Sequence, residues 1–220
     1  MTPRPLREAS DLLLTARGRI DGRSARKIET RRRIIAAATD LFAEQGYTGT
    51  SMDQIADTAG VSKGTIFYNF RSKPDLFAQL VREAAEAIAG AIQQARTGHH
   101  GWEALDAATL AVLEAADRCP GPVQIMLTEL FRAQRPWASS LRASREAMLT
   151  PLVEIFDEMA EDRVAAQGGT LLQPEDRVNV AMSVLGALVV AALDRRAYTP
   201  DRPLASVHQV LMHSLGGLNS

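Results

Sequence analysis

The sequence has few of the groups that cross-link a chain, bind a metal or cross a membrane. Its single cysteine, Cys119, cannot form an intrachain disulfide, and its 4 histidines show no zinc-ligand spacing. The apolar run without a charged residue over 178–193 falls short of the roughly 18–20 residues that a spanning helix needs. We therefore expect a soluble protein of the reducing cytoplasm, with no cofactor, no metal and no membrane partner.

The groups that indicate an enzyme are also missing. We find no nucleophile–base pair, no phosphate-binding glycine loop and no metal-ligand spacing. The acidic residues between 154 and 162 recur at helical spacing, which is typical of a solvated helix face, and His99 and His100 lie in a Gly-flanked loop. We predict that the protein is not an enzyme, and an enzyme built in the C-terminal part remains an alternative.

Positive charge is scarce in the C-terminal two thirds of the chain. The net charge is −1, but residues 1–73 hold 13 Lys and Arg against 8 Asp and Glu, whereas residues 74–220 hold 12 against 18. A basic segment joined to an acidic one suggests a contact with nucleic acid or a membrane surface at one end, or chance clustering.

No segment shows the two-residue alternation of a strand, and apolar residues recur at helical spacing along the chain. We predict an all-α fold of about nine helices: a basic flexible arm over 1–24, a three-helix unit over 25–73 and a helical bundle over 74–220. Glycine and proline separate the expected helices, which cover about 27–45, 52–59, 63–70, 74–96, 102–118, 123–133, 139–167, 175–198 and 204–215.

The second and third of these helices have the pattern of a helix-turn-helix. Ser51 and Gln54 have the spacing of a capping box, Gly60 ends the first short helix, and Ser62 caps the second. Ile66 and Phe70 share one side of that second helix, so its other side is left to face a DNA groove. The alternative is a small helical unit whose polar face contacts only water.

The stretch TSMDQIADTAGVSKGTIFYNFRSKPDLF over 50–77, with IIAAATDLFAEQGYTGT before it, resembles the DNA-binding signature of the tetracycline-repressor (TetR) family. The chain departs from the family pattern at Phe67, where Tyr is frequent, and at Asn69, where His or Tyr is usual. The positions that fit it are Gly60, Val61, Ser62, Lys63, Gly64, Thr65, Ile66, Phe70, Lys73 and Leu76.

The resemblance implies that this segment binds double-stranded DNA at a palindromic operator. Lys63 lies at a helix N-terminus, where the helix dipole favours a phosphate, and Gly64 lets the DNA backbone approach the peptide groups. The residues that the resemblance implies as DNA contacts, because they occupy the matching positions of the family pattern, are Thr50, Ser51, Ser62, Lys63, Gly64, Thr65, Tyr68, Asn69 and Lys73.

The resemblance also implies a homodimer through the last two helices and a small-molecule pocket in the bundle. The run 178–193 is apolar nearly all round, so a second subunit is expected to cover one side of it. An apolar ligand is expected to meet residues that are otherwise ordinary core: Met126, Glu129, Phe131, Trp137, Met148, Phe156 and Met182.

Together these observations predict a bacterial DNA-binding transcriptional regulator, a repressor that a small-molecule ligand releases from its operator. A regulator that needs no ligand, or an activator of the same fold, is the alternative. The sequence names neither the ligand nor the operator nor the regulated genes.

Overall fold

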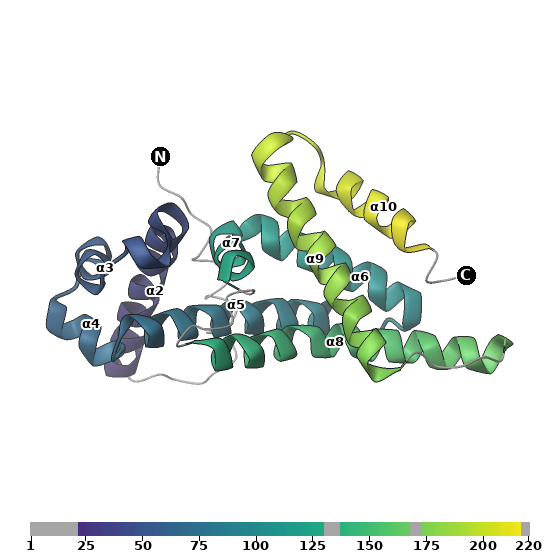
Figure 1. Ribbon diagram of the computed structural model, residues 1–220, viewed down its shortest axis with the longest axis horizontal. Helices are drawn as coiled ribbons and strands as arrows, with labels where there is room; N and C mark the ends of the chain where they lie inside the picture. The colour runs from purple at the N-terminus through teal and green to yellow at the C-terminus, as the bar shows by residue number, and fades with distance from the viewer. Residues whose placement is uncertain (1–21, 130–136, 168–172, 217–220) are drawn as a thin grey trace. The chain divides into compact units, whose positions relative to one another are not determined.

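The computed structural model describes residues 22–129, 137–167 and 173–216 (Figure 1). Over these ranges the chain forms nine α-helices and no strand, which confirms the predicted all-α class. The helices are α2 (Gly22–Gly49), α3 (Met52–Ala59), α4 (Lys63–Asn69), α5 (Lys73–Ala95), α6 (Gly101–Arg118), α7 (Pro120–Glu129), α8 (Ala138–Gln167), α9 (Pro174–Tyr198) and α10 (Leu204–Leu215).

Most helix boundaries lie within two residues of the predicted ones, and the exceptions have local causes. The first helix begins at Gly22 rather than near Lys27, and Gly46, with a φ of 72°, interrupts its helical geometry where a stop was expected. α7 begins at Pro120, because proline fits the first turn of a helix. The predicted arm over 1–24 lies almost entirely outside the described residues.

The described helices divide into two compact units. The first contains the described residues as far as Arg82 and those between Gly121 and Leu141; the second contains 83–120 and those from Arg142 onward. In the first unit, α2, α3 and α4 pack around apolar side chains that are almost fully buried: Ile34, Phe42, Ile55, Ile66 and Phe77. The boundaries 25–73 and 74–220 stay predictions.

An aromatic cluster extends the core of the first unit. Trp137, which is 2% exposed, lies with its ring centroid 4.1 Å from that of Tyr47 and 4.6 Å from that of Phe77. Phe42 also contacts both Tyr47 and Phe77. The cluster therefore joins a residue that immediately precedes α8 to the core formed by the N-terminal helices.

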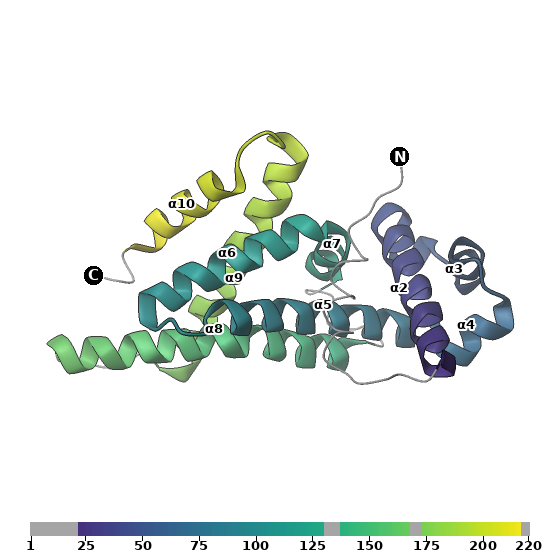
Figure 2. The same ribbon diagram turned by 180° about the vertical axis from the view of Figure 1, so that it is seen from behind.

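The second unit is built around α6, which packs along α9 while α10 lies against both helices (Figure 2). Arg195 of α9 donates to Asp117 Oδ1 of α6 at 2.7 Å. The buried His208 of α10 has its Nε2 3.0 Å from Thr109 Oγ1 and 3.1 Å from the Asp106 carbonyl oxygen, both on α6. Polar contacts thus fix α9 and α10 on the apolar face of α6.

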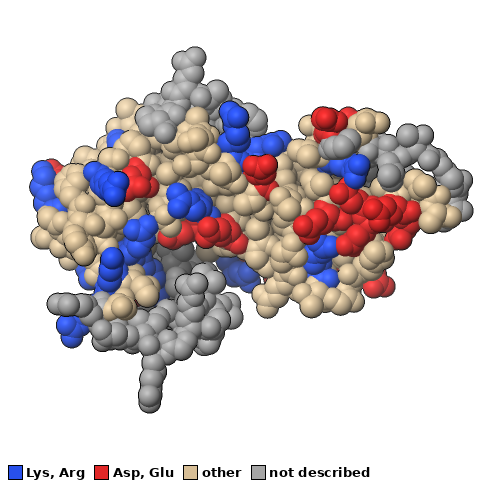
Figure 3. Space-filling model, turned by 90° about the horizontal axis from the view of Figure 1, so that it is seen from below, with Lys and Arg blue, Asp and Glu red and all other residues tan. Residues whose placement is uncertain are grey.

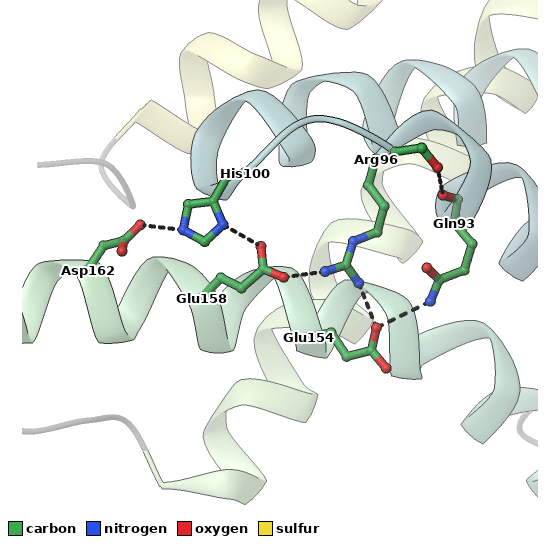
Figure 4. A network of polar contacts seen from close by, with 7 residues as sticks. Gln93, Arg96, His100, Glu154, Glu158 and Asp162 are labelled. Carbon is green, nitrogen blue, oxygen red and sulfur yellow. Dashed lines mark hydrogen bonds and ion pairs between the residues drawn. The ribbon is translucent and has the colours of Figure 1, made fainter.

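A polar network joins the end of α5 and the following turn to α8 (Figure 4). Arg96 donates to Glu154 at 2.6 Å and to Glu158, and its side chain is only 15% exposed. His100 has its two ring nitrogens 3.3 Å from Glu158 and 3.1 Å from Asp162. Three acidic residues of α8, Glu154, Glu158 and Asp162, therefore form ion pairs, although a solvated face was expected here.

Much of the apolar surface of α9 is not buried by the other described helices. By length and composition, its segment Glu175–Tyr198 is the one described helix that would suit a membrane span, and 33% of its most apolar window is buried. Such a helix is also found in soluble proteins. Val190 remains 56% exposed on α9, and Val210 of α10 is 54% exposed.

Candidate DNA-binding site

The two short helices of the candidate site begin at side-chain caps. Ser51 Oγ accepts from the Gln54 N–H at 3.2 Å, while Gln54 Oε1 accepts from the Ser51 N–H at 2.7 Å, which completes the predicted capping box. Ser62 Oγ accepts from the Thr65 N–H at 3.2 Å at the start of α4. The side chains of Ser51 and Ser62 therefore fix the first turns of both helices.

The turn between α3 and α4 needs a glycine for two reasons. Gly60 has a φ of 62°, in the left-handed region that disfavours a side chain. A Cβ at this position would also lie 2.9 Å from Nη2 of Arg33, which donates to the carbonyl oxygens of Gly60, at 3.0 Å, and Ala59. Sequence reasoning missed this role of Arg33, because charge alone does not reveal the carbonyl groups that it caps.

α4 is divided into a buried side and an outward side. Ile66 and Phe70 are 0% and 1% exposed, whereas Phe67 and Tyr68 are 42% and 77% exposed. Lys63 and Gly64 are also exposed, and a Cβ on Gly64 would meet nothing within 4 Å except Ser62 Oγ at 3.9 Å. The outward side therefore leaves the backbone of the first turn open to a partner.

Two cations lie near this outward side. Lys63 Nζ is 2.8 Å from Asp53 Oδ2 of α3, in an ion pair that spans the turn. Lys27 Nζ of α2 lies 5.7 Å from the centroid of the Tyr68 ring, so α2 places positive charge beside α4. Figure 3 shows Lys and Arg side chains over the first unit and a cluster of Asp and Glu over the second.

Thr50 and Lys73, both predicted DNA contacts, have partners inside the first unit. Thr50 is 2% exposed, and its Oγ1 contacts the carbonyl oxygens of Gly46, at 3.0 Å, and Leu41. Lys73 Nζ donates to the carbonyl oxygens of Tyr47 at 2.9 Å and Thr50 at 2.8 Å, and burial lowers the pKa of its ammonium group. Both side chains hold the end of α2 in place, and a DNA contact by either stays a prediction.

Asn69 and Thr65 are also held by local hydrogen bonds. Asn69 Nδ2 donates to the Thr65 carbonyl oxygen at 2.9 Å, and Arg31 donates to the Asn69 carbonyl oxygen at 3.1 Å. Asn69 Oδ1 is buried without a hydrogen-bond partner among the described residues. The Thr65 hydroxyl lies 2.8 Å from that of Ser62. A base contact by Asn69 therefore requires a different side-chain rotamer.

The residues predicted to meet a ligand are divided between the two units. Trp137 belongs to the first unit, while Met148, Phe156 and Met182 belong to the second. Met148 and Phe156 are buried and Met182 is half-buried. The side chains of Met126 and Glu129, and the whole of Phe131, lie outside the described residues. A ligand-binding role for any of these residues stays a prediction.

The helix-turn-helix segment also matches known proteins. The family model described as "Bacterial regulatory proteins, tetR family" matches residues 34–80. FasR, an HTH-type transcriptional activator of Mycolicibacterium smegmatis, is 25% identical over 197 residues, which cover 87% of this chain and 84% of FasR. This chain carries the N-terminal DNA-binding domain of the tetR family. It is a DNA-binding transcriptional regulator.

Two further matches concern a short part of the sequence and the fold, respectively. The regulator AcrR of Shigella flexneri is 40% identical over 65 residues, which cover 30% of each chain. The structure of FadR from Bacillus subtilis in complex with stearoyl-CoA has a TM-score of 0.68 and 17% identity, and the match covers 83% of this chain and 96% of FadR. The FadR likeness shows a shared fold.

Proposed function

We propose that this TetR-family regulator is a cytoplasmic repressor that binds a palindromic DNA operator as a dimer and is released by a small-molecule ligand. The outward side of α4 is the observation that carries the DNA-binding part of this proposal. Lys63, Gly64 and Tyr68 are exposed on one side of a short helix whose other side is buried. A helix of this kind, capped and held by a second helix, suits the major groove.

The proposed DNA contacts have three different tasks. Lys63 and the free N–H groups at the start of α4 bind a phosphate, while Thr65 and Tyr68 approach base edges or sugars. Ser51 and Ser62 contact phosphates from the first turns of their helices. Thr50, Asn69 and Lys73 act chiefly through the internal hydrogen bonds that hold the two helices in position.

We propose that α9 and α10 form the dimer interface. The exposed Val190 and Val210 provide apolar surface, and Gly186 and Ala187 allow close approach of a second helix. An isologous dimer would set two α4 helices about one DNA turn, or a multiple of it, apart. Dimer symmetry would then be matched by the symmetry of a palindromic operator.

A long-chain acyl-CoA is the ligand class that the relatives favour. FadR of Bacillus subtilis, which shares the fold, is described in complex with stearoyl-CoA. The buried Met148, Leu152 and Phe156 of α8 are adaptable apolar side chains that suit an acyl tail. Ligand binding to one of two dimer states would shift the population and change operator affinity. FasR is named an activator, so activation is the alternative outcome of the same binding.

The DNA-binding proposal can be tested by selecting sequences from random duplexes with the purified protein. We expect an enriched inverted repeat, and fluorescence anisotropy on that repeat should show weaker binding by Lys63→Ala. Stearoyl-CoA should reduce operator affinity, whereas coenzyme A alone should not. Failure to enrich any inverted repeat would contradict the palindromic operator, and unchanged affinity with stearoyl-CoA would contradict the ligand class.

A further inference from the structure

One acidic side chain lies among the cations of the proposed DNA-binding surface. Asp53 Oδ2 of α3 is 2.8 Å from Lys63 Nζ of α4, and the two residues are ten positions apart on either side of the Gly60 turn. The Asp53 and Lys63 side chains are 58% and 70% exposed. The pair is therefore formed at the surface, where both groups remain accessible to a duplex.

Apart from its pair with Lys63, the Asp53 carboxylate lies in the first turn of α3, where the helix dipole favours a negative charge. The carboxylate is not part of the capping box, in which Ser51 and Gln54 accept from each other's backbone N–H groups. An exposed ion pair of this kind contributes little to folding stability. Asp57, four residues later on the same helix, is also exposed but has no ion pair among the described residues. Asp53 thus differs from Asp57 in holding Lys63 and in lying at the start of the helix.

We propose that Asp53 restricts sequence-independent DNA binding by keeping Lys63 paired in the free protein. This inference rests on the proposed function, because it concerns the same surface. A lysine strengthens binding to any duplex by neutralising a phosphate and releasing a counterion. When Lys63 is paired with Asp53, a DNA phosphate must first displace the Asp53 carboxylate before Lys63 can strengthen DNA binding. A negative charge at this place also repels the phosphates themselves.

The consequence is a lower background affinity for duplexes of any sequence. Contacts to phosphates carry no sequence information, whereas contacts to base edges do. A genome offers about 10⁶–10⁹ competing non-specific sites, so the strength of the sequence-independent contacts decides how much protein those sites hold. Asp53 therefore limits the sequence-independent part of DNA binding through its effect on Lys63, without touching a base.

The test compares two substitutions that remove the same charge from the same helix. Asp53→Asn and Asp57→Asn are titrated against a 30-base-pair duplex of random sequence by fluorescence anisotropy, over a series of salt concentrations. Asp53→Asn should bind about two- to fivefold more tightly at low salt, as expected for loss of an exposed ion pair. Its salt slope should steepen by up to about 0.9, the value for one additional phosphate contact. Asp57→Asn should change both quantities less.

Two further variants tie the effect to the lysine. When Lys63 is already Gln, Asp53→Asn should have no more effect than Asp57→Asn, and Asp53→Glu, which keeps the charge, should bind like the wild type. Circular dichroism melting confirms that each variant is folded. Equal effects of Asp53→Asn and Asp57→Asn, or an Asp53→Asn effect that is as large with Lys63→Gln as with Lys63, would overturn this inference alone. A wild-type chain that binds no duplex would overturn the proposed function and this inference with it.

Discussion

Gly64 lies in the first turn of α4, where a Cβ would have open space. Because alanine is the better helix former, Gly64→Ala should leave the free energy of unfolding unchanged or raise it by up to about 1 kcal/mol. The added methyl group should nevertheless keep the DNA backbone from the N–H groups of α4. We expect operator affinity to fall about tenfold or more, which corresponds to about 1.4 kcal/mol.

Gly90 provides a matched control for this substitution. It is an exposed glycine inside α5, and a Cβ there would also meet nothing within 4 Å. Gly90→Ala should therefore stabilise the protein to a similar extent and leave operator affinity unchanged. Urea unfolding and fluorescence anisotropy measure the two quantities. If Gly64→Ala bound the operator as well as Gly90→Ala did, close approach of DNA at this turn would be ruled out.

Lys63 and Lys73 are both predicted DNA contacts, but their surroundings separate their roles. Lys73 Nζ donates to two carbonyl oxygens and lies 4.3 Å from the centroid of the Tyr47 ring. Lys73→Ala should lower the free energy of unfolding by about 1.5–3 kcal/mol, because hydrogen bonds to a charged group are lost. Lys63→Ala should change it by no more than about 0.5 kcal/mol, as for other exposed residues.

Urea unfolding of the two lysine variants measures this difference. Lys63→Ala should show the wild-type midpoint together with weakened DNA binding. An equal loss of stability in both variants would contradict the structural role assigned to Lys73. Lys73→Arg is a further comparison, since it keeps the charge but changes the geometry of the donors.

At the scale of single elements, Trp137, the residue that precedes α8, packs into the core of the first unit. It is 2% exposed between Tyr47 and Phe77. Trp137→Ala should lower the free energy of unfolding by about 3–5 kcal/mol, as for other large-to-small changes in a core. In a Trp102→Phe background the remaining tryptophan should fluoresce at short wavelength and resist quenching by acrylamide.

The same Trp102→Phe chain distinguishes a core role for Trp137 from contact with ligand. Titration with stearoyl-CoA should leave the Trp137 emission close to its starting wavelength if the ring contacts only the aromatic cluster. Ready quenching by acrylamide in the absence of ligand would contradict the buried position. Trp137→Phe, which retains an aromatic ring, should restore part of the stability lost in Trp137→Ala.

Helix positions could be predicted from the sequence because their signals are local. Ser51 with Gln54, and the left-handed Gly60, act over three or four residues, and both appear in the structure as predicted. The partners of Lys73 could not be predicted, because they are carbonyl groups at the end of α2 that only the folded chain brings close. For the same reason, apolar spacing did not reveal that Trp137 packs on Tyr47.

At the scale of the whole molecule, the charge division along the chain corresponds to a division of tasks. The basic residues of the first unit suit a polyanion, and Arg31 and Arg33 also hold the turn and α4 through carbonyl groups. The acidic residues of α8 are instead partnered by Arg96 and His100 within the second unit. A net charge of −1 therefore conceals an excess of basic residues over 1–73 and of acidic residues over 74–220.

The oligomeric state is the property on which operator recognition depends most. The chain has a mass of 23.9 kDa, and the proposed dimer should show twice this mass by light scattering. Val190 and Val210 are both more than half exposed, so replacing each by Asp should leave the subunit folded. The double variant should place unpaired charges in the interface and elute as a monomer, because a desolvated charge without a partner is costly.

Loss of the dimer should weaken operator binding about 10²–10⁴-fold, since the second half-site is no longer bound intramolecularly. Ile28→Asp is the control for oligomeric state, because Ile28 is an exposed β-branched residue of α2, which belongs to the first unit. This control should remain dimeric. A Val190→Asp, Val210→Asp double variant that also remained dimeric would move the interface away from these two side chains. A monomeric variant with full operator affinity would contradict the coupling between dimer symmetry and the palindrome.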